Sequence, residues 1–330
     1  MPSYRTKDIR NIALVGHSGS GKTTLAEALL VKSGAKGEAG SIERGSTTMD
    51  HDPIERTHQH SLDSAIASLD YKGMHLNLID TAGMPDFRGP TLSAMTAVET
   101  TAIVINAHAG IEQATRRLMR RAKQRRLCRM IIINRIDVED ADLTQLVTDL
   151  REEFGPACLP VNLPVDNLAS VRDCFFHTEG DTDIFSLSEA HDAIIDQVVE
   201  VNEELMEKFL EGEDMTRDEL HYAFEQALRE GHLVPICFVS AQTGAGTTEL
   251  LDFFNQLAPS PREGNPPPFV KGEGEDAVPV SISGTSNDHV VAHVFKITND
   301  PFVGKLCVFR IYQGTVRPDS QLFIGDARKP

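Results

Sequence analysis

The sequence predicts an α/β fold, with a mixed, mostly parallel sheet and helices on both of its faces. Over about the first 160 residues, short apolar runs that are typical of strands alternate with stretches of helical periodicity. Such alternation is typical of parallel sheets, in which crossover helices cover both faces. The chain of 330 residues is 40% hydrophobic, which is enough for a sizeable core and about two domains.

The expected elements follow one another in a regular order. Strands are expected at Asn11–Val15, Ile66–Tyr71, His75–Ile79, Ala102–Asn106, Met130–Asn134 and Pro235–Val239. Helices are expected at Lys22–Val31, Pro90–Glu99, Gln113–Arg126, Leu143–Phe154 and Thr248–Leu257. Because ligands of such sheets bind where loops leave the C-terminal ends of the strands, functional residues are expected in those loops.

The interval between the last two of these strands is too long for one crossover, which needs about 30 residues. We expect an acidic, helix-rich subdomain inserted at about residues 160–234. Between Val165 and His232 the sequence holds 19 Asp and Glu residues against 4 Lys and Arg. Thr216 and Glu219 resemble a capping box that opens one helix of this insertion.

A composition shift marks the end of the first domain, which we expect to span residues 8–258. Residues 259–287 are rich in Pro, Gly and Ser and are expected to form a linker. Strands are expected beyond it at His289–Ile297 and Leu306–Tyr312. About 40 residues are too few for an independent β domain, so either residues 288–330 are part of a larger domain or they pack on something else.

Composition excludes several classes of protein. No apolar run approaches the about 18 residues of a membrane span, and the N-terminus lacks the apolar region of a secretory signal. Five widely spaced cysteines without a C-x-x-C pair exclude a disulfide scaffold and a cysteine zinc module. The net charge of -17 argues against a DNA-coating protein. We therefore expect a cytoplasmic protein with no membrane or DNA partner.

The strongest motif is G-x-x-x-x-G-K-[ST], placed directly between a predicted strand and a predicted helix. Its glycines let backbone N–H groups converge on phosphate oxygens at a helix N-terminus. Lys22 would bridge the β- and γ-phosphates, and the Thr23 hydroxyl would ligate Mg²⁺. The expected phosphate-binding residues are Gly16, His17, Ser18, Gly19, Ser20, Gly21, Lys22, Thr23 and Thr24.

Two further strand ends favour a guanine nucleotide over an adenine nucleotide. Asn134, Arg135 and Asp137 form an N-[K/R]-x-D element. Its Asp can accept from guanine N1–H and from the exocyclic amine, a donor pair that adenine lacks. Ser240 and Ala241 end the last strand, where a backbone N–H can be offered to the guanine carbonyl.

Another strand ends in Asp80-Thr81-Ala82-Gly83. Asp80 can hold a water of Mg²⁺, and the Gly83 N–H can sense the γ-phosphate. We therefore assign Thr23 and Asp80 to the metal, and Lys22, Asp80 and Gly83 to hydrolysis. The expected ligands are GTP or GDP with Mg²⁺.

With these elements in order, the sequence resembles translational GTPases, and specifically elongation factor G and its paralogues. Residues 47–56 resemble the family's switch I, and Asp80–Phe87 resembles its switch II. The inserted subdomain matches the position of the module that distinguishes elongation factor G. Leu257–Pro261 resembles the end of the GTPase domain, and Asn299–Leu306 resembles the opening of the β-barrel second domain.

The resemblance implies a P-loop G domain followed by the start of a β-barrel, in a monomeric GTPase that binds the ribosome through ribosomal RNA and stalk proteins. Further domains of such proteins drive translocation or a related step. Two other functions stay open: a GTP-gated ribosome-binding switch with negligible hydrolysis, and a ribosome-protection or release-type GTPase.

Departures from the family pattern all touch nucleotide handling. Met84 stands where the family has the His that orients the attacking water, and a thioether cannot do this. The switch I Thr falls at Gln59 when residues 55 and 56 are aligned, with Thr57 and Ser61 as alternatives. Gly19 replaces a P-loop Asp, and Arg135 replaces a Lys. These changes indicate a divergent paralogue with slow hydrolysis.

Three other features have both a functional and a structural interpretation. The Arg-rich helix 113–126 is either a ribosomal RNA contact or the solvated face of an amphipathic helix. His51, His58 and His60 suggest a metal site but lie in the presumed switch I. His17 is interpreted as a packing residue rather than a catalyst.

Overall fold

The computed structural model describes residues 4–138, 140–175, 177–211, 213, 216–272, 274, 277–300 and 302–323. The chain divides into two compact units, Met1–Asn265 and Pro266–Pro330. Every helix in these described ranges is too short or too polar to cross a membrane.

The first unit is built on a seven-stranded sheet with the order β2-β3-β1-β4-β5-β9-β6. β2 is antiparallel to β3, and the pairs β1–β3, β1–β4, β4–β5, β5–β9 and β6–β9 are parallel. The predicted mixed, mostly parallel sheet is therefore confirmed. Its strands are β1 (Ile9–Val15), β2 (Ala65–Tyr71), β3 (Met74–Asp80), β4 (Thr100–Asn106), β5 (Cys128–Asn134), β6 (Cys158–Pro160) and β9 (Val234–Val239).

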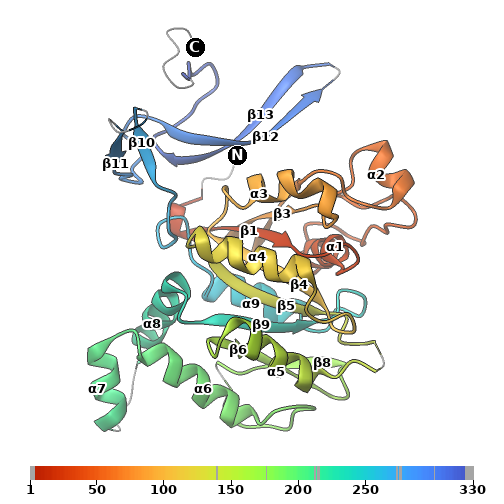
Figure 1. The fold of residues 1–330 in the computed structure, drawn as a ribbon, viewed down its shortest axis with the longest axis vertical. Coiled ribbons are helices and arrows are strands. Elements are labelled where there is room, and N and C mark those ends of the chain that lie inside the picture. The colour runs from red at the N-terminus through yellow and green to blue at the C-terminus, as the bar shows by residue number, and fades with distance from the viewer. Residues whose placement is uncertain are drawn as a thin grey trace. The chain divides into compact units, whose positions relative to one another are not determined.

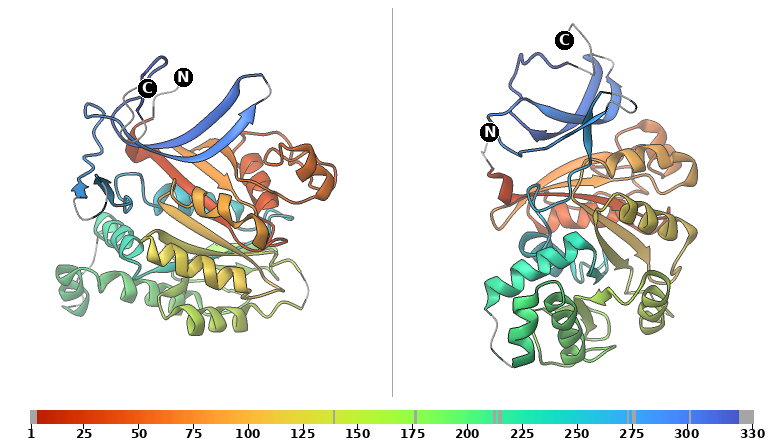
Figure 2. Two further views of the ribbon diagram at one scale, coloured as in Figure 1. Left: turned by 45° about the horizontal axis from the view of Figure 1, so that its top comes forward. Right: turned by 60° about the vertical axis from the view of Figure 1, so that its left-hand side comes forward.

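Helices cover both faces of this sheet. The helix α1 packs against α9 on one face, and α4 and α5 lie over the other (Figures 1 and 2). β4 and β5 are buried along almost their whole length because they are covered on both sides. The helices of this part are α1 (Lys22–Lys32), α2 (Pro53–His58), α3 (Arg88–Ala94), α4 (Gln113–Gln124), α5 (Leu143–Phe154) and α9 (Thr247–Gln256), with short 3₁₀ turns η1 (Thr6–Asp8) and η2 (Pro85–Phe87).

Between α5 and β9 the chain adds an antiparallel hairpin and three helices. They are β7 (Asn162–Val165), β8 (Ser170–Asp173), α6 (Leu187–Val199), α7 (Glu203–Glu211) and α8 (Arg217–Glu230). The capping box predicted at Thr216 and Glu219 is confirmed at the start of α8. Phe224 of α8 packs edge-on against Phe175 and against Phe253 of α9, which joins the added helices to the main core.

The second unit contains two antiparallel pairs, β10 (Phe269–Lys271) with β11 (Val278–Val280) and β12 (Val291–Asp300) with β13 (Gly304–Gln313). The two strands predicted there are thus confirmed as a hairpin. Its turn begins with Asp300, whose Oδ1 accepts from the N–H groups of Phe302 and Val303. Pro301 of the predicted turn lies outside the described residues.

The structure differs from the expected elements in several places. Strands β10 and β11 lie within residues 259–287, where we expected a linker. The helix expected at Pro90–Glu99 is wrong in extent, because the N–H groups of Thr96 and Ala97 bond three residues back and tighten the chain into a turn. The strand β6 was not expected. It has only three residues, which is too short to show periodicity, yet it pairs with β9 at the edge of the main sheet.

The aromatic contacts of Phe224 predict its contribution to stability. Phe224→Ala should lower the free energy of unfolding by about 3–5 kcal/mol, because a fully buried ring is replaced by a cavity. Urea denaturation measures this. Tyr222→Ala on the same helix, where the ring is 58% exposed, is the control. Equal losses in the two variants would contradict the packing described for Phe224.

Candidate nucleotide-binding site

Residues 16–23, which run from the end of β1 into the first turn of α1, are called the P-loop below. Gly16, Gly19 and Gly21 have φ values of 152°, 82° and 87°. A Cβ at Gly16 would lie 2.3 Å from the Val104 carbonyl oxygen, and one at Gly21 would lie 2.4 Å from Asn134 Nδ2. Backbone conformation thus favours glycine at all three positions, and space also requires it at Gly16 and Gly21. The loop ends at the N-terminus of α1, where backbone N–H groups favour an anion.

Lys22 lies buried under the P-loop. Its Nζ donates to the carbonyl oxygens of Gly16 at 3.1 Å and His17 at 2.9 Å. Burial lowers the pKa of Lys22, and the negative charges of Asp80 and Glu112 oppose that shift. A phosphate in the loop would therefore meet a cation whose hydrogen-bond partners are neutral carbonyls.

Asp80 ends β3 directly beside the start of α1. Its Oδ2 accepts from the Thr23 hydroxyl at 2.5 Å, whereas its buried Oδ1 has no hydrogen-bond partner among the described residues. Burial raises the pKa of Asp80 to about 6, which Lys22 and Thr23 oppose and Asp50 reinforces. A buried carboxylate oxygen without a donor is the group that a hard cation would satisfy. These oxygens fit Mg²⁺.

Two residues of the segment between α1 and β2 complete this oxygen cluster. Asp50 is buried, and its Oδ1 accepts from the Ser61 hydroxyl at 3.0 Å. The Ser61 Oγ lies 3.5 Å from Thr23 Oγ1. The cluster thus brings together oxygens of the P-loop helix, the end of β3 and the predicted switch I. Sequence reasoning did not name Asp50 as a site residue.

The three candidates for the switch I hydroxyl position, named from the sequence, have different surroundings in the structure. Gln59 is the exposed C-cap of α2, with a φ of 56°, and Thr57 is exposed and donates to the Pro53 carbonyl. Only the Ser61 hydroxyl, of these three candidates, lies beside Thr23. Gln59 and Ser61 both line the cavity over this cluster, and the Ser61 hydroxyl contacts Thr23, which favours the shifted register for switch I.

A cavity of about 340 Å³ lies over this cluster. Among the predicted residues, those that line it are His17, Ser18, Gly19, Gly21, Lys22, Thr23, Thr24, Gly83 and Arg135. A Cβ at Gly83 would lie 2.5 Å from the Ser18 nitrogen and 2.6 Å from Lys22 Nζ. Glycine thus lets the segment after β3 approach the P-loop closely.

Asn134 connects the P-loop to the two predicted guanine-reading segments. Its Nδ2 donates to the carbonyl oxygens of Ser20 at 3.0 Å and Gly21 at 3.4 Å. Its Oδ1 accepts from the N–H groups of Arg135 at 2.8 Å and Ala241 at 3.0 Å. One buried amide therefore holds three loops together.

The guanine-reading residues do not share one environment. Asp137 is exposed, whereas Ser240 is fully buried and its Oγ accepts from the Thr243 N–H at 3.1 Å. A backbone N–H at the end of β9 is predicted to face the guanine carbonyl; here the Ser240 N–H bonds to the Ala245 carbonyl and the Ala241 N–H to Asn134. Arg135 has a φ of 64° and borders the cavity. The bonds of Asn134 thus hold the predicted guanine-reading loops next to the P-loop.

Met84 lines a second cavity of about 470 Å³, between the segment after β3 and the helix α4. Leu92 and Leu118 also line it, together with the charged side chains of Arg88, Glu112, Arg117 and Arg121. His17 borders both cavities; its Nδ1 lies 2.6 Å from the Ser18 carbonyl oxygen and 3.1 Å from Glu112 Oε2.

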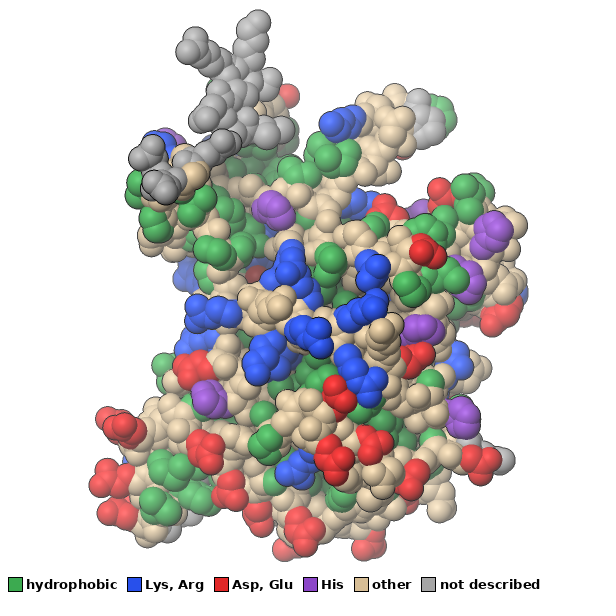
Figure 3. All heavy atoms as spheres, in the orientation of Figure 1, with side chains coloured by type: hydrophobic (Ala, Val, Ile, Leu, Met, Phe, Trp, Pro, Cys, Tyr) green, Lys and Arg blue, Asp and Glu red, His purple; other side chains and the backbone are tan. Residues whose placement is uncertain are grey.

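The outer face of α4 is strongly basic. Figure 3 shows Lys and Arg side chains gathered over α4. On the helix these are Arg116, Arg117, Arg120, Arg121 and Lys123, all exposed. Arg116 pairs with Glu153 of α5 at 3.1 Å. Within the described part of the chain, no group of three or more His, Cys, Asp and Glu residues could hold a metal, so His51, His58 and His60 do not form such a group.

The raised pKa of Asp80 predicts how stability depends on pH without nucleotide or metal. Because the pKa of Asp80 in the folded protein, about 6, exceeds the usual aspartate value of 3.8, this group favours the folded state at low pH and loses that contribution as pH rises through about 6. Asp80→Asn should therefore stabilise the metal-free protein by about 2 kcal/mol at pH 7.5 and by less at pH 4.5. Urea denaturation in chelator measures this, with the exposed Asp86→Asn as control. A destabilised Asp80→Asn at pH 7.5 would contradict the assignment.

Comparisons with known proteins agree with this geometry. The model of the family described as Elongation factor Tu GTP binding domain matches residues 7–260. An elongation factor G-like protein of Mycobacterium tuberculosis is 34% identical over 330 residues, covering 96% of this chain and 46% of that protein. An elongation factor G-like protein of Thermotoga maritima is 32% identical over 325 residues, covering 94% and 46%.

A solved structure is also similar to this chain. A crystal structure from Thermus thermophilus aligns with a TM-score of 0.80 and 32% identity, covering 96% of this chain and 47% of that chain. The chain thus spans about half the length of the relatives it matches. Because the family model covers most of the chain and these relatives cover nearly all of it, the protein belongs to the translational GTPases of the elongation factor G family.

Proposed function

We propose that this protein binds GTP with Mg²⁺ and hydrolyses it slowly in the cytoplasm on the ribosome. The observation that carries the proposal is the convergence of Thr23, Asp80, Asp50 and Ser61 beneath the P-loop. These four residues come from three segments that a nucleotide with a bound cation would contact together. A GTP-binding translation factor needs such a convergence to sense the γ-phosphate.

In the proposed complex, Thr23 and Ser61 hold Mg²⁺, and the carboxylates of Asp80 and Asp50 hold it directly or through its waters. When bound, Mg²⁺ neutralises charge on the β- and γ-phosphate oxygens. Lys22 binds the same phosphates, the P-loop N–H groups orient them, and the Gly83 N–H reads the γ-phosphate. The unpartnered Asp80 Oδ1 supports this assignment because it leaves a buried acceptor for the cation.

The base is read by Asn134, Arg135, Asp137, Ser240 and Ala241. Asp137 is exposed and can meet a base from solvent, while Asn134 keeps the loop of Ala241 next to the P-loop. Arg135 has a planar guanidinium that can stack on the base.

Slow hydrolysis is favoured by Met84. Its side chain can neither orient a water nor donate to a developing charge. The same observation supports the alternative of a GTP-gated ribosome-binding switch with negligible hydrolysis. A ribosome-protection or release-type role would depend on parts of the relatives that this chain does not match.

The basic face of α4 is our proposed contact with ribosomal RNA. Exposed guanidinium groups in a protein of net charge -17 are suited to phosphate contacts. We further propose that stalk proteins are partners, as the family implies, and that the protein acts as a monomer.

Asp137→Asn should change which base is bound. Because Asn offers a donor where guanine has donors, GTP affinity should fall about 30-fold or more, which corresponds to about 2–4 kcal/mol, and xanthosine triphosphate should bind better than GTP. Competition binding of GTP, ATP and xanthosine triphosphate measures this. Asp140→Asn, also exposed in the same loop, should leave the order unchanged. Equal ATP and GTP affinities in the natural protein would disprove the guanine assignment.

Met84→His should raise ribosome-stimulated GTP cleavage by about tenfold or more, since an orienting group is restored beside the γ-phosphate. Nucleotide affinity should change little. Single-turnover cleavage with and without ribosomes measures the rate, and Met84→Leu, which restores no polar group, is the control. If the His variant is no faster than the Leu variant, another group orients the water and the proposed cause of slow hydrolysis is wrong.

A further inference from the structure

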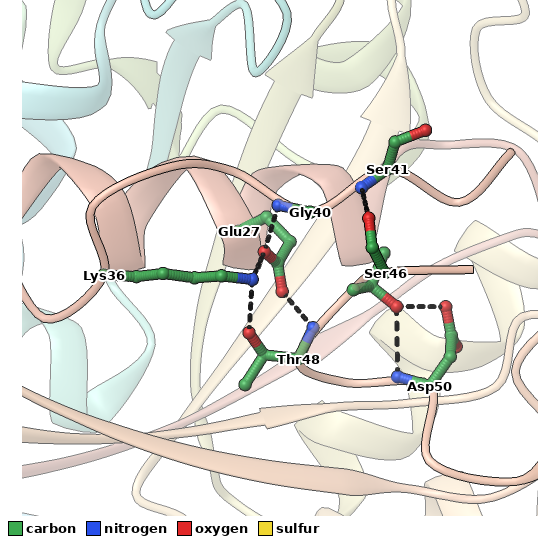
Figure 4. A network of polar contacts seen from close by, with 8 residues as sticks. Glu27, Lys36, Gly40, Ser41, Ser46, Thr48 and Asp50 are labelled. Atoms are coloured by element: carbon green, nitrogen blue, oxygen red, sulfur yellow. Dashed lines mark hydrogen bonds and ion pairs between the residues drawn. The ribbon is translucent and has the colours of Figure 1, made fainter. Parts of the chain in front are cut away.

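Glu27 of α1 is a buried carboxylate that the nucleotide-binding residues above do not include. Its side chain is 1% exposed, and it lies little more than one helical turn beyond Lys22. Figure 4 shows its contacts. Oε2 accepts from Lys36 Nζ at 2.6 Å and from the Gly40 N–H at 2.7 Å, and Oε1 accepts from the Thr48 N–H. Lys36 Nζ also donates to the Thr48 hydroxyl at 2.8 Å.

These contacts close a loop, residues 40–48, at both of its ends. Gly40 is the entry and Thr48 the exit, and both N–H groups meet on one carboxylate. Within the loop, the Ser46 N–H donates to the Ser41 carbonyl and the Ser41 N–H to the Ser46 hydroxyl, both at 3.0 Å. A Cβ at Gly40 would lie 2.3 Å from the Ser46 carbonyl oxygen, so the two ends approach closely. Glu27 therefore fixes the whole loop to α1.

The exit of this loop leads directly to the oxygen cluster. Thr47, next to Thr48, donates from its hydroxyl to Asp50 Oδ2 at 2.7 Å and accepts from the Asp50 N–H at 3.2 Å. Asp50 Oδ1 in turn accepts from Ser61. A continuous set of contacts thus runs from Glu27 to the hydroxyl that lies beside Thr23.

A second buried carboxylate, that of Glu55, holds the segment that follows Asp50 in the sequence. Glu55 accepts from the Asp52 N–H at 3.2 Å through Oε2, and from the N–H groups of Leu62 and Asp63 at 2.8 and 3.3 Å through Oε1. It closes the segment that contains α2 and Ser61, as Glu27 closes residues 40–48. Asp50 lies between these two closed segments, whose ends are both held by carboxylates.

We propose that Glu27 is a positioning residue for the cation site: by closing residues 40–48 against α1, it holds Asp50 and Ser61 next to Thr23 and Asp80. Glu27 acts through Thr47, Thr48 and Asp50 rather than by touching nucleotide or metal. This inference rests on the proposed binding of a nucleotide with Mg²⁺. Glu27 is the residue that ties residues 40–48 to α1, the helix that begins at the P-loop.

The chemistry of the contacts explains why this position holds a carboxylate. Two backbone donors and an ammonium converge on two oxygens, a demand that a neutral amide cannot meet because its nitrogen is itself a donor. Burial alone would raise the pKa of Glu27, but the hydrogen bonds from Lys36, Thr48 and Gly40 outweigh it and leave the pKa below its usual value. The group therefore stays charged near neutral pH.

The first test uses no nucleotide. In the natural protein the exposed Arg44 lies in the closed loop, which must open before trypsin can cleave there. Glu27→Gln should speed cleavage after Arg44 about tenfold or more, and Lys36→Met, which keeps the carboxylate, should speed it less. Glu38→Gln changes an exposed acid in the same segment and is the matched control. Cleavage no faster in Glu27→Gln than in Glu38→Gln would overturn the closing role of Glu27.

The second test measures the Mg²⁺ concentration that gives half-maximal GTP binding. It should rise about tenfold in Glu27→Gln, the size expected when a residue supporting metal ligands is lost. GDP binding in chelator should stay within about twofold, because the P-loop contacts do not involve Glu27. A general loss of structure would lower both affinities, and an unchanged Mg²⁺ requirement would overturn the positioning role. If the natural protein binds no GTP, the proposed function fails while the cleavage test still decides on the loop.

Discussion

The structure depends on one constraint, the burial of the Asp80 carboxylate at the end of β3. A buried charge is costly unless it is paired, and here the compensation is only partial. The Thr23 hydroxyl bonds to one oxygen and the Lys22 ammonium lies nearby, yet the other oxygen has no partner in the described chain and the pKa is raised to about 6. A fold that served stability alone would not keep a carboxylate there. The cation that we propose between Asp80, Thr23 and Ser61 would explain why it is kept.

The parallel sheet places the rest of the site around that charge. β1, β3, β5 and β9 all run in one direction, so their C-terminal ends lie along the same edge of the sheet. The P-loop follows the end of β1, Ser240 follows β9, and Asp80 and Asn134 are the last residues of β3 and β5. Asn134 bonds both to the P-loop and to the loop of Ala241, so the phosphate side and the base side are held in one arrangement. The segment from Gly40 to Ser61 is tied to this edge through side chains, above all Glu27 and Asp50.

How much of this the sequence predicts depends on how local each feature is. The P-loop and the N-R-x-D element are short, contiguous and adjacent to strands, so their residues could be placed without the fold. α5 could be placed to the residue because its apolar periodicity is strong and Asp142 caps it. β6, in contrast, is a strand only because β9 pairs with it.

Residues 40–63, which contain the predicted switch I, are the least local of these features, so the sequence predicts their structure least well. Whether Gln59, Thr57 or Ser61 brings an oxygen to Thr23 depends on how residues 40–63 fold back on α1. That path is set by tertiary bonds of Glu27 and Glu55, which no spacing in the sequence reveals. Asp50 and Glu27 were missed for the same reason: acidic residues in a polar segment or in a helix are ordinary, and only their burial distinguishes these two.

The central claim is that the Ser61 hydroxyl joins Thr23 and Asp80 in a single cation site. Its most direct test is the Mg²⁺ dependence of GTP binding in Ser61→Ala compared with Thr57→Ala, since Thr57 is the rival hydroxyl that the structure turns toward the Pro53 carbonyl. The account predicts that the Mg²⁺ requirement rises about tenfold in Ser61→Ala and is unchanged in Thr57→Ala. A larger effect in Thr57→Ala, or none in Ser61→Ala, would contradict it.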